Sequence, residues 1–195
     1  MAQRPRLPFS LESPPLSVRG IRRLIYEVTP PCSSVIMATQ QEIAYFFRLT
    51  LRLRVVDTAS VERWADSVIA TEDVARFPFT ELASASRLPS TTVDDLLGQV
   101  TGSCEPYASA RIALALLRRR IRDGLLAPET AIKHALEIAS SGPLKDRERF
   151  EAFRLEDHVW LAANEGYGTV DDVRREITEL FERYAEFDEQ IPAAI

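Results

Sequence analysis

The 195-residue sequence has few cysteines and no long apolar run, and these absences already exclude several classes of protein. Two cysteines, Cys32 and Cys104, are too few for the disulfide framework of a small secreted domain. The longest uninterrupted apolar run is residues 112–117, far short of the roughly 20 residues that a membrane-spanning helix needs. The amino end also lacks the apolar stretch and cleavage site of a secretory signal peptide. We therefore expect a cytoplasmic globular protein with no membrane partner.

The sequence also lacks the short motifs that mark common catalytic sites. It contains no HExxH, GxSxG, Walker, GxGxxG or paired CxxC motif. Its two histidines, His134 and His158, have acidic neighbours, but a zinc site needs three or four converging ligands and no single helix face supplies them. Cys104 lies just before a predicted helix, whose dipole favours the thiolate, yet the sequence identifies no positioned base. We therefore expect no enzyme activity, no metal site and no cofactor.

The net charge of the chain is low, but the charged residues are unevenly distributed along it. The formal net charge of −5 argues against a protein dedicated to nucleic acids, whose affinity depends on neutralising phosphates. Residues 1–36 carry a net +3, residues 37–143 a net −1, and residues 144–195 a net −7. The excess of negative charge therefore lies in the last quarter of the chain.

Proline separates the amino end from the rest of the chain. Six of the 12 prolines lie in residues 1–36, and because proline fixes φ and removes a backbone donor, a long helix or a central strand is excluded there. We predict that residues 1–37 are a disordered leader, or that the native protein starts at Met37, where the periodic sequence begins. Residues 38–190 form the predicted helical domain.

Within this domain, apolar residues recur at spacings of three and four, which is the period of an amphipathic helix. Two of the predicted helices are separated by four residues, so we expect them to be antiparallel neighbours. The pattern predicts an all-α fold, a single helical bundle of about six to seven helices in antiparallel pairs. The clearest predicted helices are residues 60–70, 91–100, 107–123, 128–140 and 145–164, and a last helix that starts at Thr169 and carries an apolar stripe as far as Tyr184.

One segment fits two kinds of secondary structure. Residues 47–55 alternate between apolar and polar side chains, as a half-buried strand does. The same segment also fits a helix with Phe46, Leu49 and Leu53 on one face. Because no second convincing strand is present to pair with it, we interpret the segment as helix. If it were a strand, it would be an exposed edge open to a partner.

The sequence also predicts local details of the helices. Thr169 with Asp172, and Thr91 with Asp94, have the spacing of a capping box at a helix start. Glycines around Tyr167 allow one helix to stop and the next to begin. The predicted core residues of the 145–164 helix are Phe150, Phe153, Val159, Trp160 and Leu161.

Two charged clusters are candidate binding sites. Arg118, Arg119, Arg120, Arg122 and Arg111 form the strongest basic cluster, which is either an anion-binding patch or a set of cations that answers the helix dipole and faces solvent. We favour the second interpretation. The acidic carboxyl end is the more informative cluster, because a field of one sign steers a partner of the opposite sign. The predicted partner-binding residues are Asp172, Glu176, Glu179 and Glu186.

The order of these elements resembles a known group of proteins. The resemblance rests on three segments, residues 61–69, 124–132 and 158–172, and covers roughly residues 40–187. The chain resembles small uncharacterised all-helical bacterial proteins, some of which are similar to immunity proteins of toxin–immunity systems. The resemblance implies a protein-binding role with a basic toxin domain as partner, and it carries over no site residue. The alternative is a helical scaffold or regulatory domain that binds a peptide in an apolar groove.

Overall fold

The fold of the described residues consists of helices and their connections. The structure is a computed structural model, and it describes residues 38–72, 74, 76–141 and 143–195. The predicted leader, residues 1–37, lies outside the described residues. Within the described ranges there is no strand, and the all-α prediction is confirmed. The α-helices are α1 (Gln40–Arg52), α2 (Thr58–Thr71), α3 (Phe79–Leu82), α4 (Ser90–Thr101), α5 (Pro106–Arg122), α6 (Pro128–Ser140), α7 (Asp146–Asn164) and α8 (Val170–Glu182), and the short 3-10 helices are η1 (Ala85–Arg87) and η2 (Ala185–Gln190).

Helix α5 is the central helix of the bundle. It contains the longest apolar run of the sequence, residues 112–117, and every residue of that run is buried. A helical segment that is apolar on every side, as residues 112–117 are, is surrounded by other elements, and α5 contacts α1, α6, α8 and η2. Among the described residues, no helix is both long enough and apolar enough to cross a membrane.

The amino-terminal half packs around an aromatic cluster. The Trp64 ring on α2 lies 5.2 Å from the Phe47 ring on α1 and 5.4 Å from the Phe79 ring on α3, measured between centroids. Aromatic pairs at such distances add to the burial energy of the rings. Helices α1, α2 and α3 therefore share one core layer.

Helix α4 begins differently from the prediction. Its N-cap is Pro89, which makes no side-chain hydrogen bond, so the predicted Thr91–Asp94 capping box is wrong. Asp94 instead accepts hydrogen bonds from Arg48 Nε and Nη2 on α1, at 3.0 and 3.1 Å. A guanidinium and a carboxylate form a strong pair when two hydrogen bonds join them. The pair with Arg48 on α1 therefore replaces the capping hydrogen bond that was predicted for Asp94.

The ambiguous segment 47–55 is helical as far as Arg52. The chain then turns through Arg54, whose φ of +55° is left-handed although it carries a side chain. The N–H groups of Arg54 and Val55 bond the carbonyls of Leu51 and Thr50, at 3.0 Å each. This pairing is a Schellman motif with arginine at the position where glycine is usual.

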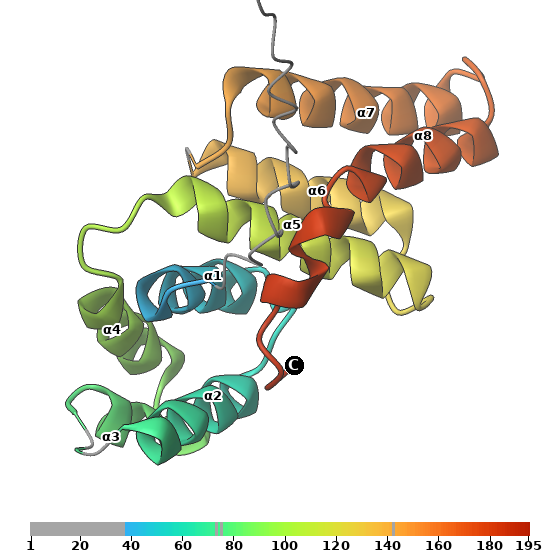
Figure 1. Ribbon diagram of the computed structural model, residues 1–195. Helices are drawn as coiled ribbons and strands as arrows, with labels where there is room; N and C mark the ends of the chain where they lie inside the picture. Colours follow the sequence, from blue (N-terminus) through green and yellow to red (C-terminus); the bar gives the residue numbers. More distant parts are fainter. Residues whose placement is uncertain (1–37, 73, 75, 142) are drawn as a thin grey trace, which may run out of the picture. The chain divides into compact units, whose positions relative to one another are not determined.

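The carboxyl-terminal half consists of two helical hairpins, which Figure 1 shows as α5 with α6 and α7 with α8. The expected antiparallel pairing across the four-residue connection of α5 and α6 is confirmed. Gly166 and Gly168 have positive φ between α7 and α8, as predicted. The predicted cap is also confirmed, because the Thr169 hydroxyl accepts the Asp172 N–H at 3.1 Å.

Candidate functional site

The first candidate site is a pocket of about 600 Å³ between the α1–α2 connection, the start of α4, the end of α5 and the last residue. Val55 and Val56 contribute buried apolar surface, and Leu51 and Ile195 add to it. The pocket is within the size range of small-molecule sites. Its other lining residues are Arg54, Asp57, Thr58, Ser60, Arg63, Ser90 and Arg120.

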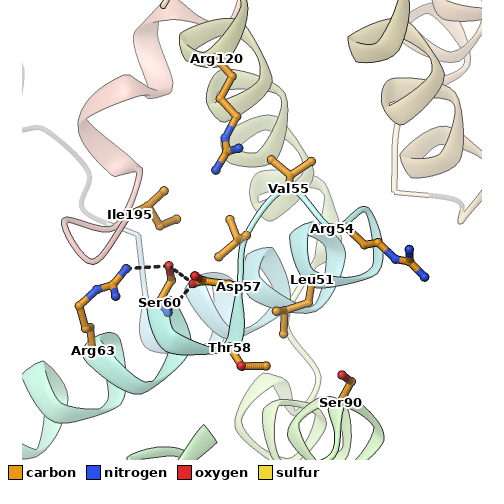
Figure 2. Close-up of a pocket in the computed structure, with 11 residues that line it drawn as sticks. Leu51, Arg54, Val55, Asp57, Thr58, Ser60, Arg63, Ser90, Arg120 and Ile195 are labelled. Atoms are coloured by element: carbon orange, nitrogen blue, oxygen red, sulfur yellow. Dashed lines mark hydrogen bonds between the residues drawn. The ribbon is translucent and has the colours of Figure 1, made fainter. Parts of the chain in front are cut away.

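The three arginines of this pocket have different surroundings. Figure 2 shows the Arg120 side chain pointing from α5 toward Val55 and Ile195, whereas the Arg54 side chain points away from them. Arg63 donates to the Ala194 carbonyl oxygen at 2.8 Å and to the Ser60 hydroxyl at 2.9 Å. Arg120 has no hydrogen bond or ion pair from its side chain to any described residue.

The only acidic residue of this pocket caps helix α2. One Asp57 carboxylate oxygen accepts the Ser60 N–H at 2.9 Å and the Ser60 hydroxyl at 2.7 Å. These hydrogen bonds hold the pKa of Asp57 below its usual value. The carboxylate is therefore already satisfied by the helix it starts, and the second acidic group of the lining is the terminal carboxylate of Ile195.

The basic cluster of α5 binds the carboxyl-terminal segment of the same chain. Arg118, whose side chain is 12% exposed, pairs with Glu182 at 2.7 Å and with Asp188 at 2.8 Å. Arg119 donates to the Asp188 carbonyl oxygen at 3.0 Å, and Arg122 lies 3.7 Å from the Asp188 carboxylate. The interpretation that these cations only face solvent and interact with the helix dipole is therefore incomplete, because they also bind the carboxyl-terminal segment.

Arg111 extends this contact by about two turns of α5 toward its amino end. It pairs with Glu186 at 3.0 Å, and its guanidinium carbon lies 4.1 Å from the centre of the Phe187 ring. A cation above an aromatic face adds attraction beyond the ion pair. We call Arg111, Arg118, Arg119 and Arg122 the arginine clamp, because together they hold residues 182–188 against α5.

The predicted partner-binding residues are spread over the surface and are mostly paired within the chain. Asp172 pairs with Arg175 at 2.7 Å, and Glu176 pairs with Arg154 at 3.2 Å. Glu186 belongs to the arginine clamp through Arg111. Glu179 is exposed and forms no ion pair with any described residue. Internal pairing of this kind reduces the negative charge that is available to a partner.

The outer face of α7 is the second candidate site. The prediction that its aromatic side chains belong to the core is wrong. Phe150, Phe153 and Trp160 were expected in the core, but they are 68%, 50% and 51% exposed. Of the other two expected core residues, Val159 packs against the core and Leu161 is half-buried. We call Phe150, Phe153 and Trp160 the aromatic face; the exposed Asp157 lies between Phe153 and Trp160 at helical spacing.

The reason for this error is that α7 carries two apolar stripes. The stripe that is buried consists of smaller side chains, Ala152, Leu155, Val159 and Ala162. Small side chains let α7 approach its neighbours α6 and α8 closely, and α7 lies at the edge of the bundle. Only one stripe is covered, and the larger aromatic side chains remain outside.

The remaining chemical candidates show no activated group. Burial, with a smaller contribution from Glu42, raises the pKa of the Cys104 thiol, so this thiol is not activated as the helix dipole alone suggested. Burial lowers the pKa of His134. Within the ranges that the structure describes, no three His, Cys, Asp or Glu side chains converge well enough to hold a metal ion.

Comparisons with known proteins do not assign a family. No family model matches the chain, and no curated protein or solved structure matches it. The two candidate sites are therefore interpreted from their own geometry. Sequence reasoning missed both, and Arg120 within an arginine-rich run is the single sequence signal that pointed near the pocket.

Proposed function

We propose that this chain is a non-enzymatic, cytoplasmic protein-interaction protein that binds its partner through the aromatic face of α7. The observation that carries the proposal is the exposure of Phe150, Phe153 and Trp160 on one side of a single helix. Contiguous exposed apolar surface marks interaction sites, and aromatic side chains contribute strongly to binding energy when a partner covers them.

The size of the aromatic face supports a binding role. The three aromatic side chains are 68%, 50% and 51% exposed, and because each can bury about 150–250 Å², they leave about 250–420 Å² for a partner to cover. Flanking side chains of α7 enlarge this area toward the roughly 800 Å² that each partner contributes to a specific interface.

Asp157 indicates the charge of the partner. It is exposed between Phe153 and Trp160 and forms no ion pair with any described residue. A partner that covered the rings without a cation would leave this carboxylate desolvated and unpaired, which is costly. We infer a partner surface that combines apolar side chains with an arginine or lysine opposite Asp157.

This partner chemistry agrees with the expectation of a basic partner. An immunity-type role, in which the chain covers a basic surface of a toxin, is therefore retained as the narrower form of the proposal. Of the predicted partner-binding residues Asp172, Glu176, Glu179 and Glu186, Glu179 is exposed with no ion pair to any described residue and adds to the negative field, whereas the other three are paired within the chain. Asp157 and the rings supply the contact itself.

A second candidate function is supported by an apolar hollow. A pocket of about 570 Å³ is lined by Ile43, Trp64, Ile191 and neighbouring residues of the carboxyl end. A groove of this character suits an apolar peptide segment, as in a scaffold or regulatory domain. For this alternative, we expect labelled peptides with apolar anchors to bind the unmodified chain and to bind more weakly to Ser67→Glu, which places a charge at an exposed position of the lining.

The main proposal is tested by cross-linking from within the aromatic face. A photoreactive phenylalanine analogue replaces Trp160 in the full chain, and a control chain carries it at Leu125, which is 72% exposed elsewhere. The expected result is a protein cross-linked from position 160 only. That protein, once purified, binds the unmodified chain and loses at least about tenfold affinity for Asp157→Lys, since close charge pairs at interfaces are worth over 1 kcal/mol.

Three outcomes contradict the proposal. They are no product from position 160, the same products from position 125, and a purified protein that binds Asp157→Lys as well as the unmodified chain. A product between two copies of this chain would identify a homodimer and overturn the basic partner.

A further inference from the structure

The pocket of Figure 2 is lined by an arginine whose side chain has no partner among the described residues. Helix α5 carries Arg120 and, in addition, the four residues of the arginine clamp, all of which have a carboxylate or carbonyl partner within the chain. The Arg120 side chain has none among the described residues, and it points into the pocket instead. A guanidinium with unused donors beside a pocket is a ready site for a carboxylate.

Arg120 is the charged group of the pocket that is available to an anion. Arg63 is engaged by Ser60 and Ala194, and the Arg54 side chain points away from Val55 and Ile195. The carboxylates of the lining are those of Asp57 and of the chain end at Ile195. Asp57 is held by two hydrogen bonds from Ser60, so it does not compete for Arg120.

The aliphatic residues of the lining indicate that the anionic group belongs to a ligand with an apolar part. Leu51, Val55, Val56 and Ile195 present aliphatic surface to the pocket. A small inorganic ion would leave this surface wet, whereas an aliphatic body would cover it and gain from the hydrophobic effect.

We propose that this pocket binds a small amphipathic carboxylate. Its carboxylate accepts hydrogen bonds from Arg120, and its aliphatic body packs on Val55, Val56 and Ile195. The site is independent of the aromatic face of α7, since the two share no residue.

The proposal is tested by titrating the isotope-labelled full chain with hexanoate and following its amide resonances by NMR. Acetate keeps the charge without the aliphatic body, and 1-hexanol keeps the body without the charge. The expected result is saturable shifts confined to residues 51–60 and the surroundings of Arg120 and Ile195. Acetate and hexanol each bind at least about tenfold more weakly, because each lacks one half of the recognition.

Variants identify the residue responsible. Arg120→Gln weakens hexanoate binding by about tenfold or more, and Arg120→Lys by less, because lysine keeps the charge but loses the planar fork. Arg147→Gln, on an 84% exposed side chain of α7, is the matched control and leaves binding unchanged. The spectrum of each variant outside the pocket reports that it is folded.

The proposal is overturned if hexanoate gives no saturable shifts, or if hexanol binds equally well. It is equally overturned if folded Arg120→Gln binds hexanoate with unchanged affinity. None of these results bears on the α7 partner, whose test uses different residues.

Discussion

Arg118 of α5 and Asp188 of η2 lie 2.8 Å apart, and this ion pair joins the basic cluster of the sequence to its acidic end. The same arginine pairs with Glu182, so one guanidinium holds both α8 and η2. Three acidic residues of the carboxyl-terminal quarter, Glu182, Glu186 and Asp188, therefore form one internal contact with the arginine-rich helix. This part of the charge asymmetry of the chain contributes to its folding.

Replacing Arg118 tests the strength of this contact. Arg118→Gln leaves Asp188 and Glu182 without their main cation and is expected to lower the free energy of unfolding by about 2 kcal/mol, the range for hydrogen bonds to charged groups. Arg122→Gln is the control, because its side chain is 53% exposed and such pairs contribute under about 1 kcal/mol. Urea unfolding of both variants measures the difference, and equal losses would contradict the role given to Arg118.

The left-handed Arg54 predicts a stabilising substitution. A side chain at φ +55° is disfavoured by contact of Cβ with the backbone, and glycine removes that contact. Arg54→Gly is expected to raise the free energy of unfolding by about 0.5–1 kcal/mol, partly offset by the greater freedom of glycine in the unfolded chain. Arg54→Ala keeps Cβ and should give no such gain in the same urea experiment. A gain of equal size in both variants would mean that the arginine side chain, not the backbone, is the cause.

The pair between Arg48 and Asp94 predicts acid sensitivity. The hydrogen bond from Arg48, opposed by burial, holds the pKa of Asp94 below its ordinary value of 3.8. The folded state therefore binds this proton less readily than the unfolded state. The stabilisation is complete above pH 3.8 and is lost as pH falls through the lower pKa of the folded state.

Asp94→Asn removes this contribution. Its stability should be lower than that of the unmodified chain at pH 6, and the difference should shrink as the pH falls below 3.8. Asp95→Asn, on an exposed residue with no ion pair to any described residue, is the control. A difference that does not change with pH, measured by urea unfolding, would contradict the assignment.

His134 gives a second pH effect, in a higher range. Burial lowers its pKa from the ordinary 6.5, against a smaller opposing effect of Glu137, so the folded state prefers the neutral imidazole. Stability is then complete above pH 6.5 and decreases as pH falls toward the lower pKa of the folded state. Between about pH 7.5 and 5.5, the melting temperature of His134→Gln should depend less on pH than that of the unmodified chain. His158→Gln should not show this change. Equal profiles for both variants would refute the prediction.

The helices could be predicted from the sequence because each one carries its own local information. The period of apolar residues marked α2, α5 and α8, and Thr169 marked a helix start that the structure confirms. The cap predicted at Thr91 was wrong because its outcome depended on Arg48, 46 residues from Asp94 in the chain. Local patterns therefore decide helices, whereas long-range partners decide what a polar side chain binds.

The candidate sites were not predictable, for a related reason. The pocket combines Val55, Arg120 and Ile195, which no spacing in the sequence connects. The aromatic face was mistaken for core because Phe150 and Trp160 are more apolar than Ala152, and composition ranks them first. Which of two apolar stripes is covered depends on how closely the neighbouring helices approach.

The same contrast gives a prediction for α7. Replacing Phe150, Phe153 and Trp160 together by serine removes three aromatic side chains that are each at least half exposed. The free energy of unfolding should change by less than about 1.5 kcal/mol, because each surface substitution changes it by about 0.5 kcal/mol and serine and aromatic residues have similar helix propensities. Leu155→Ala, on the buried stripe, should lower it by about 2–4 kcal/mol, because it leaves a cavity against the neighbouring helices. Urea unfolding of the two variants measures both changes in the free energy of unfolding. If the triple variant lost as much as Leu155→Ala, the aromatic face would belong to the folding core and would not be available to a partner.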